Sequence, residues 1–309
     1  MDAQYKLGQV ATLQTLDRNH RLASARDYAE CRRIMRAASK NYSSASNYLP
    51  ADKLPHVEAL YALMRVGDDR VDVSHKGFKS AEQAIDDWEH TYWQAFEHGD
   101  SPHAVMRAYL DTAVKFKIPI ETMAAYFRAM REDLHITRFP TFNDLKHYME
   151  GSAIPVGRAM THILGTAPGY SLEEALPGAD SLSIAMQLSN FWRDIGEDWR
   201  IGRVYLPQED MKLFDYPESD LADKKVNARL KALLEHQFER TERYYEHARA
   251  HIKMLGNGQW AIMSALEIYK AILTNIRANN YDVFDYRAGT SRWQKASLAV
   301  RAYWQVRWN

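Results

Sequence analysis

Residues 181–200 read SLSIAMQLSNFWRDIGEDWR, and the spacing of their apolar residues predicts a helix that is apolar nearly all round. One stripe differs, because polar side chains follow it at spacings of three, four and four: Gln187, Asn190, Asp194 and Asp198. A polar ridge on a buried helix is costly unless it faces a ligand, a metal or a wet cavity. The alternative is a hydrogen-bond network that only fixes the helix register. We expect a ridge that faces a ligand.

A second acidic pair lies in HVEALYALMRVGDDRVD, residues 56–72. Apolar side chains at helical spacing define the inward face of this helix: Val57, Tyr61 and Met64. Asp68 and Asp72 continue the same stripe. Carboxylates four residues apart repel each other, and burial adds a desolvation cost, so a bound cation would relieve both. The alternative is an exposed acidic pair; Asp69 points away from the stripe and, with Glu197, is a weaker candidate.

Two acidic pairs on separate core helices favour Mg²⁺, which prefers oxygen ligands and binds through one or two carboxylates plus substrate phosphates. No His/Cys cluster has the spacing of a zinc site. Arginines lie beside both motifs: Arg65, Arg193, Arg200 and Arg203. Taken singly, each arginine would be expected to form a surface ion pair, but their clustering beside both motifs favours a diphosphate clamp for Arg65 and Arg193.

The overall composition argues against nucleic acid as the partner. Lys plus Arg and Asp plus Glu both total 40, so the net charge is near zero. The single cysteine, Cys31, excludes an internal disulfide and favours a reducing compartment. The N-terminus has no apolar signal core, and nowhere do eighteen apolar residues follow one another. We expect a cytoplasmic protein, soluble or peripheral at a membrane.

The segmentation of the chain predicts an all-α fold in one domain, residues 1–309, with an extension at 1–25 and a final helix at 291–309. Ten prolines divide the 309 residues into segments of helical length. Residues 221–255 predict one long charged outer helix. The last residues, SLAVRAYWQVRWN, predict a frayed end with a partly packed aromatic face, or alternatively a membrane-interface helix.

Four motifs together resemble the squalene/phytoene synthase family, whose members join two isoprenyl diphosphates head to head. They are YALMRVGDDRVD (61–72), YMEGSAIPVG (148–157), QLSNFWRDIGEDWRIGRVYLP (187–207) and IYKAILTNIRANNYDVFDYR (268–287, matched to the family's closing helix). The resemblance runs from about Cys31 to about Arg287 and is nearest to bacterial members. It implies a single helical bundle around a central cavity.

The resemblance also implies roles for individual residues. The expected magnesium ligands are Asp68, Asp72, Asn190, Asp194 and Asp198, with Tyr148 and Tyr205 as further catalytic residues. The expected substrate contacts are Ser39, Lys40, Tyr42, Arg65, Gln187, Asn190, Arg193, Tyr269 and Arg287. Mg²⁺ is the expected cofactor; NADPH serves family members that make squalene, but no dinucleotide fingerprint supports it here.

The family mechanism gives the aromatic and small residues a use. Loss of diphosphate leaves an allylic carbocation, a second prenyl chain attacks it, and a cyclopropylcarbinyl diphosphate forms and ionises in turn. Aromatic faces could stabilise these cations, namely Tyr42, Tyr148 and Phe191, although each alone reads as ordinary core. The small residues Gly151, Ser152, Ala153 and Gly157 either leave room for an isoprenoid or allow close helix packing.

Two departures from the family pattern leave the product open. Ala38 stands where members often carry His, and Pro155 interrupts the small-residue segment and could bend its helix. The alternatives are a hydroxysqualene synthase, a single-substrate terpene synthase, or a non-catalytic scaffold relative. Substrate chain length and oligomeric state also stay open.

Overall fold

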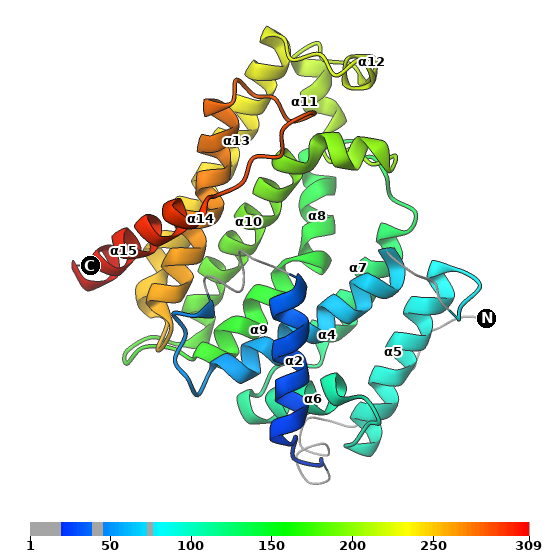
Figure 1. Cartoon of the computed structure of the whole chain (residues 1–309), viewed down its shortest axis with the longest axis vertical. Helices are drawn as coiled ribbons and strands as arrows, with labels where there is room; N and C mark the ends of the chain where they lie inside the picture. Colours follow the sequence, from blue (N-terminus) through cyan, green and yellow to red (C-terminus); the bar gives the residue numbers. More distant parts are fainter. Residues whose placement is uncertain (1–19, 39–45, 73–76, 309) are drawn as a thin grey trace. The chain divides into compact units, whose positions relative to one another are not determined.

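The computed structural model describes residues 20–38, 46–72 and 77–308, excluding the side chains of residues 71 and 72. All regular elements in these residues are helices, apart from two isolated bridges, so the predicted all-α class is confirmed (Figure 1). The described residues form two compact units, residues 20–38 with 50–134, and residues 46–49 with 135–308. The expected single domain stays a prediction.

The first unit is built around the helix that carries the first acidic motif. Its helices are α2 (Ala25–Ala38), α4 (Leu54–Asp72), α5 (Ala81–His98), α6 (Ala104–Phe116) and α7 (Glu121–Asp133). Helix α4 packs against α2, α5 and α6, and α7 packs against α5. α5 begins where the Ser80 side chain accepts a hydrogen bond from the Gln83 amide and ends at Gly99, whose φ of 70° suits glycine.

The second unit is built around the helix of the second motif. Its helices are α8 (Phe142–Ser152), α9 (Ile154–Leu164), α10 (Leu172–Arg200), α11 (Gln208–Leu213), α12 (Glu218–Ala222), α13 (Ala228–His251), a 3₁₀ turn (Ile252–Met254), α14 (Gln259–Ala278) and α15 (Arg292–Trp308). Helix α10 packs against α9, α13 and α14. Trp192 is fully buried, and its Nε1 donates to Thr241 Oγ1 of α13 at 2.9 Å.

Three predictions about helix boundaries are wrong. Pro177 does not end a helix but lies in the second turn of α10, where the Ser171–Glu174 capping box already holds the helix start. Residues 221–255 form no single helix, because α13 begins only after Asn227, whose side chain caps it. The segment 268–287 is helical only to Ala278. The final helix is present and continues to Trp308 instead of fraying.

Pro155 coincides with a break between two helices. α8 ends at Ser152, Ala153 leaves helical geometry at φ −122° and ψ −47°, and α9 starts with Pro155 in its first turn. A proline is tolerated there because the first amides of a helix have no intrahelical acceptor. The predicted bend is therefore a change of helix direction between two separate segments.

Gly157 favours the packing interpretation of the small-residue segment. A Cβ atom at this position would lie 2.1 Å from Ser183 Oγ and 3.0 Å from the Ala179 carbonyl oxygen of α10. The Ser183 hydroxyl donates to that same carbonyl at 2.9 Å, so it cannot rotate away without losing a hydrogen bond. Glycine thus lets α9 and α10 approach closely.

Replacing Gly157 by valine is expected to destabilise the protein by about 2 kcal/mol, because the added methyl groups overlap α10. The matched control is Gly289→Val, where an added Cβ meets no atom within 4 Å. Thermal unfolding of both variants checks this. Equal melting temperatures for the two variants would contradict the packing role of Gly157.

Candidate functional site

In the first motif, Asp68 is held by a tyrosine from another helix. The hydroxyl of Tyr126, on α7, lies 2.9 Å from the Met64 carbonyl oxygen and 3.2 Å from Asp68 Oδ1, and it donates to both. A Cβ atom on Gly67 would lie 2.2 Å from this hydroxyl, so only glycine allows the approach. The sequence interpretation missed Tyr126; the glycine on the buried side of α4, just before Asp68, was the available signal.

The other charged side chains of this motif, Arg65, Asp69 and Arg70, each have an ion-pair partner on α4 or α5. Arg65 forms an ion pair with Asp69, one turn further along α4. Arg70 donates to Asp87 at 2.7 Å and lies over the Trp88 ring, 4.4 Å from its centroid. The carboxylate of Asp69 is therefore engaged by Arg65.

Some of the predicted site residues lie outside the part of the chain that the structure describes. The backbone of Asp72 ends α4, but its side chain lies outside the described residues, as do the predicted substrate contacts Ser39, Lys40 and Tyr42.

In the second motif, α10 presents the predicted polar ridge. Its four members are all partly exposed along the helix: Gln187, Asn190, Asp194 and Asp198. Most positions between them are buried, including Leu188, Phe191 and Ile195, whereas Glu197 is exposed. The ridge therefore borders solvent-accessible space.

Two arginines hold Asp194. Arg193 donates through Nε to Asp194 Oδ1 at 2.7 Å, and Arg287 reaches the two carboxylate oxygens at 2.8 and 3.1 Å. Arg287 also lies 3.3 Å from Glu197. Arg193 was predicted to contact diphosphate and Arg287 to contact the substrate; in this structure both pair with Asp194.

A tightly built loop brings Arg287 to α10. After α14 the chain turns through Asn280 and Tyr281, whose φ angles of 56° and 64° are left-handed. The Val283 carbonyl then accepts a hydrogen bond from the Gly196 amide of α10 at 3.1 Å. A Cβ on Gly196 would lie 2.7 Å from that carbonyl oxygen, so glycine in the middle of the motif permits the contact.

The two aspartates of α10 differ in acidity. Burial raises the pKa of Asp194, but the hydrogen bonds and charges of Arg193 and Arg287 outweigh it, so that pKa lies below its ordinary value. Burial, together with the charge of Asp194 one turn away, raises the pKa of Asp198 to about 7, against the opposing charge of Arg203. The two carboxylates of the ridge therefore differ in charge: Asp194 favours its ionised form, whereas Asp198 keeps its proton to a higher pH than an ordinary aspartate.

This donor set fits a hard divalent cation that is shared with a phosphate group. Carboxylate and amide oxygens are the ligands of Mg²⁺, and Asp198 gains from any added positive charge. Among the described side chains, no three His, Cys, Asp or Glu residues form a metal site by themselves. A cation here would thus need further ligands, which a diphosphate and water supply.

An aromatic cluster borders the ridge. Phe191 and Tyr205 stack face to face at 3.9 Å, and Tyr148 of α8 lies 6.4 and 6.1 Å from their ring centroids. Phe139, absent from the prediction, lies 5.3 Å from Tyr148 and 5.6 Å from Tyr205. Phe191 and Phe139 both stack on Tyr205, so these rings form a packed, buried aromatic cluster.

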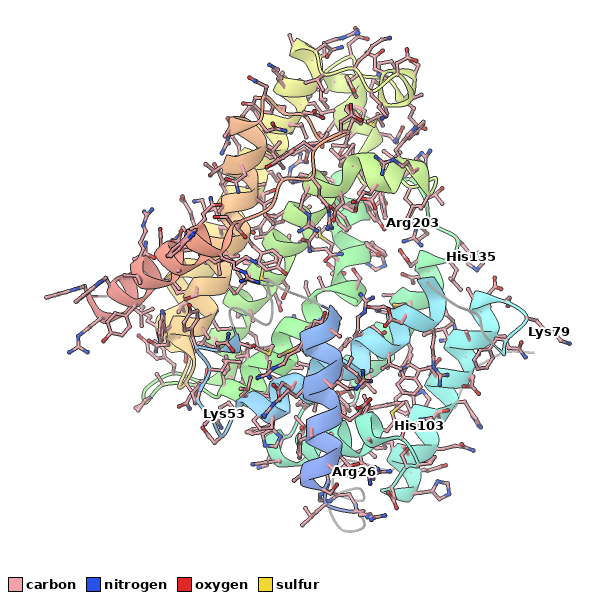
Figure 2. All side chains as sticks on the ribbon, viewed as in Figure 1. Arg26, Lys53, Lys79, His103, His135 and Arg203 are labelled. Carbon is pink, nitrogen blue, oxygen red and sulfur yellow. The ribbon has the colours of Figure 1, made fainter. Side chains whose placement is uncertain are left out.

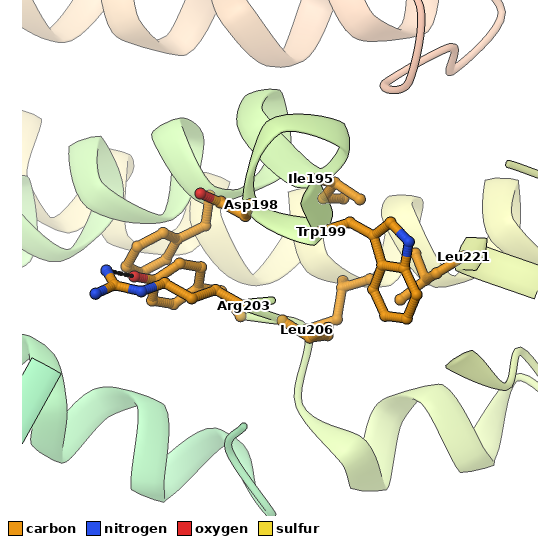
Figure 3. A pocket seen from close by; sticks show the side chains of 9 residues that line it. Ile195, Asp198, Trp199, Arg203, Leu206 and Leu221 are labelled. Atoms are coloured by element: carbon orange, nitrogen blue, oxygen red, sulfur yellow. Dashed lines mark hydrogen bonds between the residues drawn. The ribbon is translucent and has the colours of Figure 1, made fainter. Parts of the chain in front are cut away.

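Beside this cluster lies a small hollow with a cavity volume of about 10 Å³, room for about one water molecule. Figure 3 shows the polar ends of Asp198 and Arg203 gathered on one side and the apolar Trp199, Leu206 and Leu221 on the other. Arg203 lies just beyond the end of α10 (Figure 2), and its Nη1 donates to the Tyr205 hydroxyl at 3.2 Å. The hollow thus combines a charged edge with an apolar wall.

Tyr269 is buried in α14 and lies near Tyr245. Burial, and to a smaller degree Tyr269, raises the pKa of Tyr245, whose hydroxyl lies 2.7 Å from Ser189 Oγ of α10. The predicted substrate contact of Tyr269 stays a prediction, as do the other site roles.

Comparisons with known proteins agree on one family. Residues 35–294 match the profile described as squalene/phytoene synthase. The chain is 32% identical over 287 residues to a 15-cis-phytoene synthase of Synechococcus elongatus, covering 88% of this chain and 91% of that protein. It is 33% identical over 282 residues to a phytoene synthase of Arthrospira platensis, covering 87% and 89%.

Solved structures agree on the fold. A dehydrosqualene synthase in complex with a ligand superposes with a TM-score of 0.84 at 26% identity, covering 92% of this chain and 98% of that one. A squalene synthase from Alicyclobacillus acidocaldarius superposes with a TM-score of 0.73 at 26% identity, covering 83% and 95%. The predicted isoprenoid-synthase fold is confirmed.

Replacing Asp198 by asparagine is expected to stabilise the metal-free protein at pH 8. The folded state keeps the Asp198 proton up to about pH 7, whereas the unfolded chain releases it near 3.8. The wild type should therefore lose stability as pH rises from 4 through 7, and Asp198→Asn should lose less. Thermal unfolding in chelator from pH 5 to 8 measures this.

Asp194→Asn is the matched variant, and its effect on stability should be the opposite, a destabilisation. Its carboxylate is paired with two arginines, so the substitution should cost about 1–3 kcal/mol at neutral pH. Stabilisation by Asp194→Asn, or a fall in stability with pH that is the same in Asp198→Asn as in the wild type, would contradict the assigned charge states.

Tyr126→Phe is expected to cost about 1 kcal/mol and to weaken Mg²⁺ binding, because Asp68 loses the hydroxyl that orients it. Tyr109→Phe, a buried tyrosine of α6, is the control for stability alone. Calorimetric Mg²⁺ titrations in the presence of inorganic diphosphate compare the two variants. Unchanged affinity in Tyr126→Phe would exclude the orienting role.

Proposed function

Since the chain belongs to the squalene/phytoene synthase family, we propose that each of its two acidic motifs binds isoprenyl diphosphate through Mg²⁺. The protein is a prenyltransferase that condenses two isoprenyl diphosphates head to head to a squalene- or phytoene-type product. The proposal concerns which residues do this. They are Asp68 and Asp72 of α4 with Asn190, Asp194 and Asp198 of α10.

One observation carries the proposal. The α10 ridge holds two carboxylates one turn apart, of which one is neutralised by arginines and the other by a raised pKa. A ridge whose only purpose was helix register would not need carboxylates that are balanced in this way. A cation bound at this ridge would therefore favour the ionised form of Asp198.

The arginines support a role in leaving-group departure. When bound, Mg²⁺ supplies positive charge that neutralises the leaving diphosphate. If Asp194 held the cation, Arg193 and Arg287 would be free to donate hydrogen bonds to diphosphate oxygens in place of Asp194. Arg287 is the better placed of the two to move, because its side chain is 53% exposed whereas that of Arg193 is 14% exposed.

The aromatic cluster and the apolar wall support the steps after ionisation. The rings of Tyr148 and Phe191 present electron density to a passing carbocation. Ile195 and Leu206 exclude water, which would otherwise capture the cation as an alcohol. Arg203 fixes the Tyr205 hydroxyl, so this polar atom is kept in one place beside the hollow.

Substrate length belongs to the proposal as well. The two phytoene synthases at 32 and 33% identity favour a twenty-carbon substrate for this chain, while the dehydrosqualene and squalene synthases at 26% keep a fifteen-carbon substrate open. Contact with a membrane surface is also proposed, because prenyl chains and their products partition into lipid.

Incubation of the protein with farnesyl or geranylgeranyl diphosphate and Mg²⁺, with and without NADPH as hydride donor, is expected to release diphosphate and a coupled hydrocarbon, identified by mass spectrometry of the extract. An alcohol as the product even with NADPH present would indicate a hydroxysqualene synthase. Recovery of only a cyclised single-substrate product would overturn the head-to-head assignment. The reaction should stop in chelator and with Asp68→Ala or Asp194→Ala.

Two aspartates serve as matched controls. Asp180→Ala removes a carboxylate from the same helix, α10, where it pairs with Arg158 at 2.6 Å away from the ridge. Asp69→Ala removes the weaker candidate of α4. Both should keep most of the turnover. If Asp68→Ala and Asp194→Ala retain turnover equal to these controls, the two motifs are not the active site.

A further inference from the structure

Helix α15 carries an apolar stripe on its solvent side. At 100° per residue, four large side chains fall within about 80° of one another around the helix: Trp293, Val300, Trp304 and Trp308. Their exposed fractions are 87, 58, 51 and 79%. Single exposed apolar residues are ordinary on protein surfaces, but a run of three indoles and a valine on one helix face is not.

The orientation of the stripe is fixed by the opposite face. Ala299 and Ala302 are buried where α15 packs on α14, and Trp260 Nε1 of α14 donates to the Ala299 carbonyl at 2.8 Å. Val306 packs against the same core. α15 lies beside α14 (Figure 1), and because Ala299 and Ala302 on the opposite side of α15 make this contact, the stripe faces solvent.

Positive charge borders the stripe on both sides. Arg301 and Arg307 are exposed and flank the indoles at about 80° and −40° around the helix, measured from Trp293. Arg292 and Lys295 add to the charge of the same helix, and residues 286–309 contain no Asp or Glu. The helix is therefore strongly basic in a protein whose net charge is zero.

The chemistry of the stripe selects one occupant. A second copy of the chain would bring Arg301 and Arg307 of both copies together around a two-fold axis, where they repel. Tryptophan and arginine beside each other suit the boundary between phospholipid headgroups and acyl chains, where indoles settle and guanidinium groups bind phosphate. In the described residues no helix is long and apolar enough to cross a bilayer, so contact would be lateral.

We propose that α15 docks this protein, parallel to the surface, on bilayers that contain anionic phospholipids, with Trp293, Trp304 and Trp308 inserted at the headgroup boundary. The inference deepens the membrane contact proposed above by naming its surface and its lipid class. It rests on the exposed stripe and its charges and does not depend on the reaction catalysed.

The test is flotation of the full-length protein with vesicles of phosphatidylcholine alone or mixed with phosphatidylglycerol. The wild type should float with the mixed vesicles, bind phosphatidylcholine at least tenfold more weakly, and dissociate as salt rises. Trp293→Ser/Trp308→Ser should lose at least tenfold in affinity, and Arg301→Gln/Arg307→Gln should lose the preference for the anionic lipid. Leu213→Ser, which removes an exposed leucine of α11, should bind like the wild type.

Circular dichroism and the rate of condensation on detergent-dispersed substrate separate this inference from the catalytic one. Both should be unchanged in the tryptophan variant, so loss of vesicle binding with full turnover supports the docking surface alone. Equal flotation of the wild type and the tryptophan variant overturns the proposal. A dimer in light scattering that disappears in that variant also overturns it, because the stripe would then bind a second copy.

Discussion

Like charges held one turn apart on a half-buried helix are the constraint on which this structure depends. Asp194 and Asp198 repel each other, and burial makes ionisation of both more costly. The protein balances the pair asymmetrically, with two arginines on Asp194 and a raised pKa on Asp198. The loop after α14 carries Arg287 to Asp194, and Arg203, whose charge opposes the rise in the Asp198 pKa, is held by its contact with Tyr205.

The two acidic motifs use glycine in the same way. Gly67 lets the Tyr126 hydroxyl reach Asp68, and Gly196 lets the Val283 carbonyl dock on α10 close to Asp194. In each motif a side chain would block a distant segment that orients the carboxylate or supplies its counter-charge. Glycine costs helix stability at both positions, by about 1 kcal/mol relative to alanine, so the approach of the distant segment must stabilise the fold by more than that.

Local periodicity accounts for what the sequence could predict. The all-α class, the α10 ridge and the packing of Val57 and Met64 follow from spacings of three and four, because a helix places such residues on one face. The errors have two sources. One is local: Pro177 lies inside α10 because the capping box of Ser171 and Glu174 secures the helix start, a signal that the spacing of prolines does not include. The other is contact between residues that are distant in the sequence. The Tyr126–Asp68 contact and the position of Phe139 result from tertiary packing, which no short stretch of sequence encodes.

The central claim is that each acidic motif binds a cation together with a diphosphate. The most direct measurement is anomalous diffraction from crystals of the protein soaked with Mn²⁺ and a non-reactive prenyl diphosphate analogue. The account predicts a metal peak at Asp68 or Asp72 in the first motif and another at Asp194 or Asp198 in the second, each beside diphosphate oxygens, with Arg287 moved from Asp194 to the diphosphate. A motif that binds no metal, or a diphosphate held without metal away from both motifs, would contradict it.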